Sequence, residues 1–202
     1  MNSGASYYTI TDSVQAKLEI KGSRFLALAY PVSSAAEVKT LLEKLNREYS
    51  DAAHLCYAYC IGTGSNQLRK AFDAGEPNFS AGQPILNAIL SQTLADVLVV
   101  VVRWFGGTKL GKANLAKAYR QAAELALKKA EKVERPVTEK ITLRFDSDKF
   151  NLVNSLLQRY KAELVEKNFN TRCRIMARVP LSNLPAVKER LLEVTAGKIK
   201  FE

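Results

Sequence analysis

One apolar run constrains the fold of this chain more than any other segment. Residues 97–102 read VLVVVV, and an unbroken run rich in β-branched residues predicts a strand that is buried on both faces. The run ends at Arg103, and Gly106 and Gly107 follow it before a helix that begins near Gly111. The sequence therefore predicts a buried strand, a glycine-rich turn and a helix in direct succession.

This turn has the chemistry of an anion site. A helix N-terminus directs free backbone N–H groups and the positive end of the helix dipole to the same point, and nearby lysines add positive charge. The alternatives are a solvated loop, or an arginine that pairs with Asp73 or Glu76. Neither the standard phosphate-loop spacing nor the dinucleotide pattern G-x-G-x-x-G is present. The residues expected to contact phosphate are Arg103, Gly106, Gly107, Lys109 and Lys112.

The composition is that of a globular protein. A length of 202 residues fits one large domain or two small ones, and 47% apolar residues can form packed cores. No apolar run reaches the roughly 20 residues of a membrane helix, and the first residues lack the pattern of a secretory signal. Three cysteines argue against a disulfide framework. We therefore expect a cytoplasmic protein without a membrane partner, in which Cys56 and Cys60 are buried, reduced thiols.

The charge points to a polyanionic partner. The formal net charge is +10, and the excess is divided evenly between the residues before Pro136 and those from Pro136 onward. Basic character spread over the whole chain favours RNA, DNA or the ribosome as partners.

The segment EKVERPVTEK, residues 131–140, is charged and contains a proline, so we expect a linker there. It separates an expected first domain, 1–133, from a second, 134–202. For the first domain the patterns predict strands over 7–11, 14–20, 25–31, 55–61, 68–72 and 97–103, and helices over 35–49, 84–94 and 112–129. A hairpin turn is expected over 62–67.

The second domain has a simpler order. We expect a strand over 137–145, a helix over 147–160, strands over 163–169 and 172–179 joined by a turn at 170–171, a helix over 181–195 and a strand over 197–201. This β-α-β-β-α-β order is that of the ferredoxin-like fold, so the fold class expected for the whole chain is α+β.

Three residues are candidates for catalysis, each with a structural alternative. His54, the only histidine, could act as a general base because imidazole exchanges a proton near neutral pH; packing at a strand end explains it as well. Asp73 and Glu76 could serve as acid and base or bind a cation, but such carboxylates more often close a loop by accepting backbone N–H groups. The chain has no second histidine and its cysteines lack metal-ligand spacing, so no metal or cofactor is expected.

Two further sets of side chains could contact nucleic acid. Arg172, Arg174 and Arg178 have even spacing on one predicted strand and so share a sheet face. They would form a phosphate patch or an exposed basic face without function. Trp104 and Phe105 could stack on bases, although aromatic residues at a strand end more often belong to the core.

Four segments of the chain resemble the IMPACT/YigZ family. They are KGSRF (21–25), HLCYAYC (54–60), DAGEPNFSAGQPIL (73–86) and VVVVRWFGGTKLGKANLAKAY (99–119). The resemblance implies a first domain with the fold of ribosomal protein S5 domain 2 and a second like a C-terminal domain of elongation factor G. It also implies a link to translation, because eukaryotic relatives of the first domain are translational regulators that bind a protein partner. Nucleic-acid binding is usually proposed for the bacterial members.

The chain departs from the family pattern at several positions. Ala74 stands where a second acidic residue is usual, which weakens the case for a two-carboxylate metal site. Ala113 and Asn114 replace two glycines at the helix entry, which weakens the case for the anion site. The other departures are Cys60 and Lys117, where arginine is usual, and Asn78 and Phe79, where small residues are usual.

Three functions follow from these features. The leading hypothesis is a translation-associated regulatory protein that binds RNA or the ribosome through basic, phosphate-contacting surfaces. The first alternative is an enzyme that acts on a phosphate-bearing small molecule, with His54, Asp73 and Glu76 near the loop Gly106–Lys112. The second alternative is a protein–protein adaptor.

Overall fold

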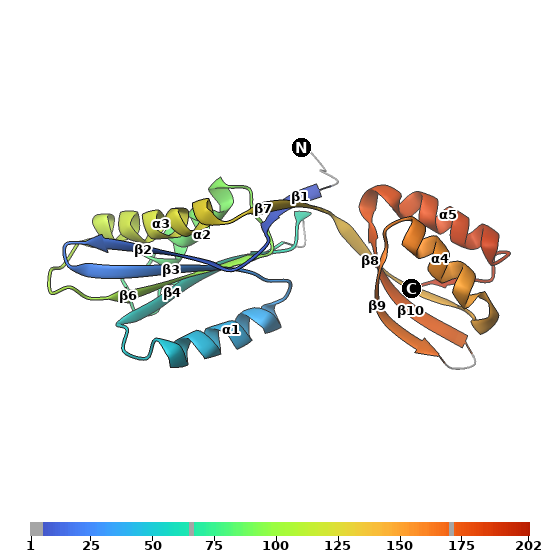
Figure 1. Cartoon of the computed structure of the whole chain (residues 1–202), viewed down its shortest axis with the longest axis horizontal. Coiled ribbons are helices and arrows are strands. Elements are labelled where there is room, and N and C mark those ends of the chain that lie inside the picture. Colours follow the sequence, from blue (N-terminus) through green and yellow to red (C-terminus); the bar gives the residue numbers. More distant parts are fainter. Residues whose placement is uncertain (1–5, 65–66, 170–171) are drawn as a thin grey trace. The chain divides into compact units, whose positions relative to one another are not determined.

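The chain folds into two units, described here from a computed structural model (Figure 1). The structure describes residues 6–64, 67–169 and 172–202. The first unit is Tyr7–Arg135, and the second contains Pro136–Glu202. The division lies two residues beyond the boundary expected from the sequence. No described helix combines the length and the apolar character needed to cross a membrane.

A five-stranded antiparallel sheet forms the centre of the first unit. Its strand order is β2-β3-β6-β4-β5. The strands are β2 (Val14–Ile20), β3 (Ser23–Pro31), β6 (Val97–Trp104), β4 (His54–Ile61) and β5 (Leu68–Phe72). The apolar run occupies the central strand, and each residue from Val97 to Val102 has no solvent exposure. The prediction of a strand buried on both faces is confirmed.

Helices on both faces bury this strand. Figure 1 shows helix α1 (Ala35–Glu48) on one face and helices α2 (Gly82–Ser91) and α3 (Lys112–Lys129) on the other. Alternate side chains of β6 enter the two cores: Val97, Val99 and Val101 join the α2–α3 core, while Leu98, Val100 and Val102 join the α1 core. By the same alternation, Arg103 belongs to the α2–α3 face.

The second unit has the β-α-β-β-α-β order predicted from the sequence. Its sheet is antiparallel with the order β11-β8-β10-β9. Both helices pack on one face, where Leu143 and Ile175 meet Val153 and Leu191. The other face carries no described helix of this unit. The elements are β8 (Thr138–Asp146), α4 (Phe150–Arg159), β9 (Glu163–Phe169), β10 (Arg172–Pro180), α5 (Leu184–Val194) and β11 (Lys200–Phe201).

The division between the two units lies inside the segment 131–140, which was predicted as a linker, but this segment is not irregular chain. Lys132–Pro136 forms strand β7, which pairs with β1 (Ser6–Ile10) in a two-stranded sheet, and the Thr11 N–H donates to the Glu131 carbonyl at 3.1 Å. Charged residues and proline occur in linkers and also in exposed edge strands. The sequence pattern therefore did not distinguish strand β7 from an irregular linker. The long-range partner, β1, could not be read from the local pattern.

Two smaller differences concern helix ends and turns. Helix α2 begins at Gly82 rather than 84, because the Asp73 carboxylate accepts the Gly82 N–H at 2.9 Å and so caps the first turn. The helix predicted over 147–160 opens with a 3₁₀ turn, Ser147–Lys149. The turn predicted over 62–67 includes residues 65–66, and the turn at 170–171 comprises the other pair; both pairs lie outside the described residues.

A close backbone approach joins the β2–β3 turn to the loop after β6. A Cβ atom at Gly106 would lie 1.9 Å from the carbonyl carbon of Gly22, and no side chain fits at that distance. The backbone of Gly106 has no positive φ, so this position requires space rather than conformational freedom. Gly107 is the opposite case: its φ is +85°, and a Cβ atom there would have no neighbour within 4 Å. Gly106 therefore fixes the shape of this sheet end.

The substitution Gly106→Ala is expected to lower the free energy of unfolding by about 3 kcal/mol, because the new methyl group overpacks against backbone. Gly107→Ala is the matched control, and it is expected to cost about 1 kcal/mol through its left-handed backbone alone. Urea unfolding of both variants measures the difference. Equal losses would contradict the close approach.

Candidate functional site

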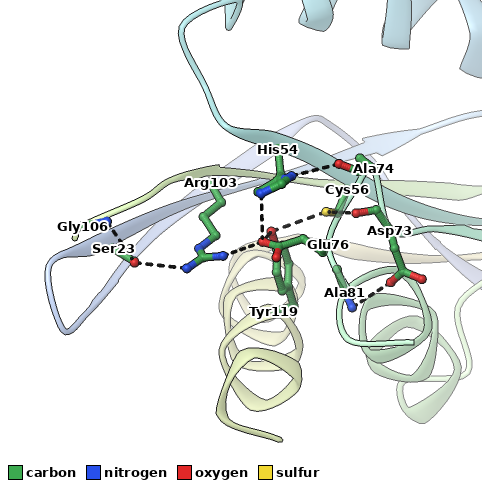
Figure 2. Close-up of polar contacts among 10 residues, drawn as sticks. All are labelled: Ser23, His54, Cys56, Asp73, Ala74, Glu76, Ala81, Arg103, Gly106 and Tyr119. Atoms are coloured by element: carbon green, nitrogen blue, oxygen red, sulfur yellow. Dashed lines mark hydrogen bonds and ion pairs between the residues drawn. The ribbon is translucent and has the colours of Figure 1, made fainter. Parts of the chain in front are cut away.

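A buried carboxylate organises the α2–α3 side of the first unit. Glu76 lies in the loop between β5 and α2, and its side chain is only 4% exposed. Its Oε1 accepts hydrogen bonds from Nη1 of Arg103 at 2.6 Å and from the hydroxyl of Tyr119 at 2.8 Å (Figure 2). We call Glu76, Arg103, Tyr119, His54 and Cys56 the Glu76 cluster.

Four different elements bring this cluster together. Arg103 near the end of β6 lies directly opposite His54 at the start of β4, in register across the two strands. Tyr119 reaches the same point from α3, where it is fully buried. Phe25 on β3 packs its ring against Tyr119 at 5.3 Å, edge to face, and lies 5.6 Å from the Arg103 guanidinium. The cluster therefore depends on the tertiary fold and not on a local motif.

The guanidinium of Arg103 is buried and bonded to other side chains of the protein. Its side chain is 6% exposed and forms the ion pair with Glu76, and Nη2 also donates to the Ser23 hydroxyl at 3.4 Å. Within the described residues its Nε has no hydrogen-bond partner. A guanidinium in this position has no free surface for a phosphate. The expectation of an Arg103–phosphate contact is therefore replaced by its alternative, a pair with Glu76.

The hydrogen-bond network continues to the glycine loop. The Ser23 hydroxyl that meets Arg103 also accepts the backbone N–H of Gly106 at 3.2 Å. The Gly106 N–H was expected to contact phosphate, but in the structure it is bonded to Ser23. In this loop Gly106, Gly107, Lys109 and Lys112 are all exposed. Because the Gly106 N–H is bonded to Ser23, the candidates for phosphate contact are Gly107, Lys109 and Lys112.

The helix entry behind this loop has no side-chain cap among the described residues. Gly111, with φ of +78°, precedes α3 and leaves the first N–H groups without a bond from a capping side chain. Asn114, at one of the departures from the family pattern, donates its side-chain amide to the Leu110 carbonyl at 3.0 Å. Ala113 is exposed. These two residues are compatible with the helix start, so neither departure disturbs the backbone that carries Lys109 and Lys112.

His54 is the partly exposed member of the cluster. Its Nδ1 lies 2.9 Å from the carbonyl oxygen of Ala74, so this nitrogen is assigned the proton and Nε2 is the acceptor in the neutral ring. Nε2 lies 3.8 Å from Oε1 of Glu76, and the side chain is 26% exposed. His54 also borders a hollow of about 460 Å³ lined by Tyr57 and Phe72.

Asp73 has a structural role. Its carboxylate accepts backbone N–H groups from Phe79, Ala81 and Gly82, each at 2.9 Å. These bonds close the loop between β5 and α2, in which Ala74 and Phe79 both adopt positive φ. Since Asp73 is turned toward the loop and Glu76 toward Arg103, the two do not form a paired acid and base. The third catalytic candidate, His54, has a side chain that is 26% exposed.

The environment of Cys56 keeps its thiol protonated and does not activate it as a nucleophile. Its thiol donates to the Asp73 carbonyl at 3.0 Å and lies 3.4 Å from the Tyr119 hydroxyl. Burial raises the pKa of the Cys56 thiol to about 12, and burial together with the adjacent Cys56 and Glu76 raises the pKa of Tyr119 as well. A thiol that keeps its proton is a poor nucleophile. Cys56 and Cys60 are free and buried, as expected.

The second unit carries a different candidate surface, on its helix-free face. Arg174 is exposed and Arg178 is half-buried, while Cys173, Ile175 and Ala177 point into the core. This alternation confirms that Arg174 and Arg178 share a face. Arg178 lies opposite Glu163 in the strand register. Arg172 begins β10, and its side chain lies outside the described part of the chain.

A basic hollow of about 840 Å³ lies at one end of this face. Four cationic side chains line it: Arg144, Arg174, Lys198 and Lys200. Sequence reasoning found only Arg174, because the others come from β8 and from the C-terminal segment, and their proximity requires the strand order. The alternation in TEKITLRFD (138–146) was the available signal for Arg144.

Two carboxylates partly neutralise this hollow. Glu202 accepts from Nε of Arg144 at 2.9 Å and lies 4.0 Å from Nε of Arg174, and Asp146 also lines the hollow. The side chains of the Arg144–Glu202 pair are 51% and 39% exposed, so solvent reaches both. Four cations against two carboxylates leave a net positive surface. In the described part of the chain no group of three or more His, Cys, Asp or Glu residues is arranged to hold a metal ion.

Glu76→Gln is expected to lower the free energy of unfolding by about 3–5 kcal/mol, because it leaves the Arg103 guanidinium buried without its counter-charge. Glu124→Gln is the matched control. It breaks an Arg–Glu pair of similar length, 2.7 Å, on the exposed side of α3, and it is expected to cost about 0.5 kcal/mol or less. Denaturant unfolding provides the measurement, and similar losses in both variants would refute the role of burial.

Stability is expected to fall as the pH rises above about 9. The unfolded Cys56 thiol loses its proton near its ordinary pKa of 9.0, whereas the folded thiol retains it until about 12. Between these values the folded state binds more protons, so raising the pH favours unfolding. Cys56→Ala should therefore flatten the decline in unfolding free energy between about pH 9 and 11. An unchanged slope in this variant would show that Cys56 does not contribute.

Known proteins resemble this chain over both units. The Impact N-terminal domain model matches residues 21–127. An IMPACT family member of Haemophilus influenzae is 30% identical over 98% of this chain and 97% of its own length. YvyE, an IMPACT family member of Bacillus subtilis, is 30% identical over 96% of this chain and 88% of its own length. Protein IMPACT of Oryctolagus cuniculus is 40% identical, but over 44% of this chain and 29% of its own length.

A solved structure supports the same relationship at the level of the fold. The crystal structure of a hypothetical protein superimposes with a TM-score of 0.78 at 23% identity, and it covers 98% of this chain and 97% of its own. The domain match spans more than half of the chain, and the bacterial relatives match nearly all of it. The segments HLCYAYC, DAGEPNFSAGQPIL and RWFGGTKLG therefore carry a true family signal, and the chain belongs to the IMPACT family.

Proposed function

We propose that this protein is a translation-associated regulatory protein that binds RNA or the ribosome through phosphate contacts. The single observation that carries the proposal is the basic hollow on the helix-free face of the second unit, lined by Arg144, Arg174, Lys198 and Lys200. Membership of the IMPACT family supports the link to translation, because the family resemblance implies a regulatory role there. A protein partner, which the eukaryotic relatives suggest by analogy, is an alternative to this proposal.

The chemistry of this face favours phosphate over base recognition. From Cys173 onward, the side chains on the helix-free face of β10 include Arg174, Met176 and Arg178. None of these is aromatic, so this strand offers bases no ring to stack on. Arginine forms charge-assisted hydrogen bonds with phosphate in a fixed fork geometry. The ion pair between Arg144 and Glu202, at 2.9 Å, holds the Arg144 side chain at the edge of the hollow.

The loop Gly106–Lys112 supplies a second basic surface in the first unit. Lys109 and Lys112 are exposed, and neither forms an ion pair with a described carboxylate. Gly107 is exposed beside them. We assign phosphate contact in this unit to Gly107, Lys109 and Lys112. Arg103 and Gly106 have a structural role here: both donate to the Ser23 hydroxyl, and these bonds connect the loop to β3.

We further propose that the two units have folds of the translation machinery. The strand order β11-β8-β10-β9 with both helices on one face supports a ferredoxin-like second unit, similar to a C-terminal domain of elongation factor G. The first unit would share the fold of ribosomal protein S5 domain 2. This likeness is one of analogy and supports the function only indirectly.

Binding of this kind should weaken steeply with salt, because each neutralised phosphate releases counterions. Filter binding to ribosomes, transfer RNA and single strands, over a series of salt concentrations, tests the proposal. No binding to any of these at low salt would overturn it.

The double variant Arg144→Gln with Arg174→Gln is expected to reduce the slope of log K against log salt. For a single strand each lost phosphate contact removes about 0.7 from this slope, so the pair removes about 1.4. The matched control is Arg159→Gln with Lys161→Gln, which removes the same charge from exposed positions at the C-terminal end of α4 in the same unit. An equal change in the control would show that net charge, and not the hollow, determines binding.

A further inference from the structure

We propose that Trp104 forms the floor of a base-stacking subsite for single-stranded nucleic acid, beside the loop Gly106–Lys112. The inference rests on the proposed function and names the form of nucleic acid that the first unit would take. Its basis is a hollow of about 430 Å³ that lies on the α1 side of the five-stranded sheet and is lined by Lys17, Glu19, Arg24, Leu26 and Trp104, among others.

The hollow exists because α1 covers only part of its face of the sheet. Figure 1 shows the end with the β2–β3 turn extending beyond this helix. Alternation places Lys17 on β2, Arg24 on β3 and Trp104 on β6 on this uncovered side, and Arg24 lies directly opposite Trp104 in register. Leu26, 8% exposed, provides an apolar base between them. A volume of this size falls in the range of small-ligand pockets.

The indole is fixed in position before any ligand binds. Its Nε1 donates to the Asp51 carboxylate at 2.9 Å, and the ring of Tyr49 packs against it at 6.0 Å, nearly perpendicular. The guanidinium of Arg24 lies 5.3 Å from the centre of the indole ring. A rigid aromatic ring loses little conformational freedom on binding, and preorganisation of this kind favours affinity.

The charges at the rim match a phosphodiester strand. Lys17 and Arg24 are exposed, and no ion pair joins either of them to a described carboxylate. Among the described residues that line the hollow, Lys17 and Arg24 outnumber the one carboxylate, Glu19. A second carboxylate, Asp51, lies beside the hollow and is engaged by the indole N–H. A base can stack on the indole or on the Arg24 guanidinium while its phosphates meet the cations.

The hollow also adjoins the basic loop. The β2–β3 turn, which leads into Arg24, touches the loop at the Gly22–Gly106 approach, and Trp104 precedes that loop directly in sequence. The loop that carries the exposed Lys109 therefore begins at the edge of the hollow. Paired bases in a duplex are already stacked on their neighbours, so the geometry favours an unpaired base.

Trp104 gives a direct test, because it is the only tryptophan in the chain. Its emission, excited beyond tyrosine absorption, is followed while oligoadenylate, a duplex of the same length, or inorganic polyphosphate is added. Oligoadenylate is expected to quench the emission. Polyphosphate carries charge but no bases, and the bases of a duplex are already paired. Both are expected to bind with much less quenching of the Trp104 emission. Equal quenching by polyphosphate would overturn base stacking.

Two variants measure the contribution of the subsite by filter binding. Trp104→Leu is expected to weaken oligoadenylate binding by about tenfold or more, the effect of one lost stacked base, and to leave polyphosphate binding unchanged. Trp104→Phe retains a ring and should recover part of the loss. If Trp104→Leu is unfolded by thermal melting, Lys17→Gln with Arg24→Gln replaces it, since both side chains are exposed.

The matched control for that double variant is Lys117→Gln with Lys128→Gln, on the exposed side of α3. If Lys17→Gln with Arg24→Gln binds oligoadenylate more weakly than this control does, the result supports the subsite. Equal affinities of the two double variants contradict it. Filter binding also separates the two proposals. Oligoadenylate that binds without quenching Trp104 refutes only the subsite, whereas the absence of all nucleic-acid binding refutes the proposed function as well.

Discussion

The buried ion pair between Glu76 and Arg103 is the interaction on which the first unit depends. It joins the loop before α2 to the end of the central strand, and Tyr119 extends the contact to α3. Ser23 carries it onward to Gly106. A charge buried without a partner is costly, so these elements must meet in one arrangement. The pair thereby fixes the sheet end from which the glycine loop, Trp104 and Lys109 are presented.

The molecule separates compensated charge from uncompensated charge. Inside the first unit, Glu76 balances Arg103, and Asp73 is satisfied by three backbone N–H groups. Among the residues that line the two hollows, cations exceed carboxylates. Lys17 and Arg24 stand against Glu19 in the first unit, and four cations stand against Asp146 and Glu202 in the second. The paired interior charges stabilise the fold. The exposed cations that exceed the carboxylates beside them are available to bind a polyanion.

Local pattern predicted nearly every strand and helix, because the periods of 2 and 3.6 and the apolar runs were clear in this chain. At 131–140 it located the connection between the units but missed strand β7, because β7 pairs with β1, which lies more than 120 residues earlier in the sequence. The candidate site was predicted less well. His54, Glu76 and Arg103 were identified as residues with chemistry, but their roles depend on partners that lie 20 or more positions away along the chain, and no local pattern encodes such partners.

By itself the sequence determined the family, the order of elements and the buried central strand, since these follow from motifs and from local periodicity. Only the tertiary structure decided which charged residues are available. Arg103 and Arg174 are both arginines on predicted strands, yet Arg103 is 6% exposed beside Glu76 and the Arg174 side chain is 50% exposed beside a basic hollow. Exposure and counter-charge depend on what packs across the sheet, and that is set by strand order and helix placement rather than by any single segment.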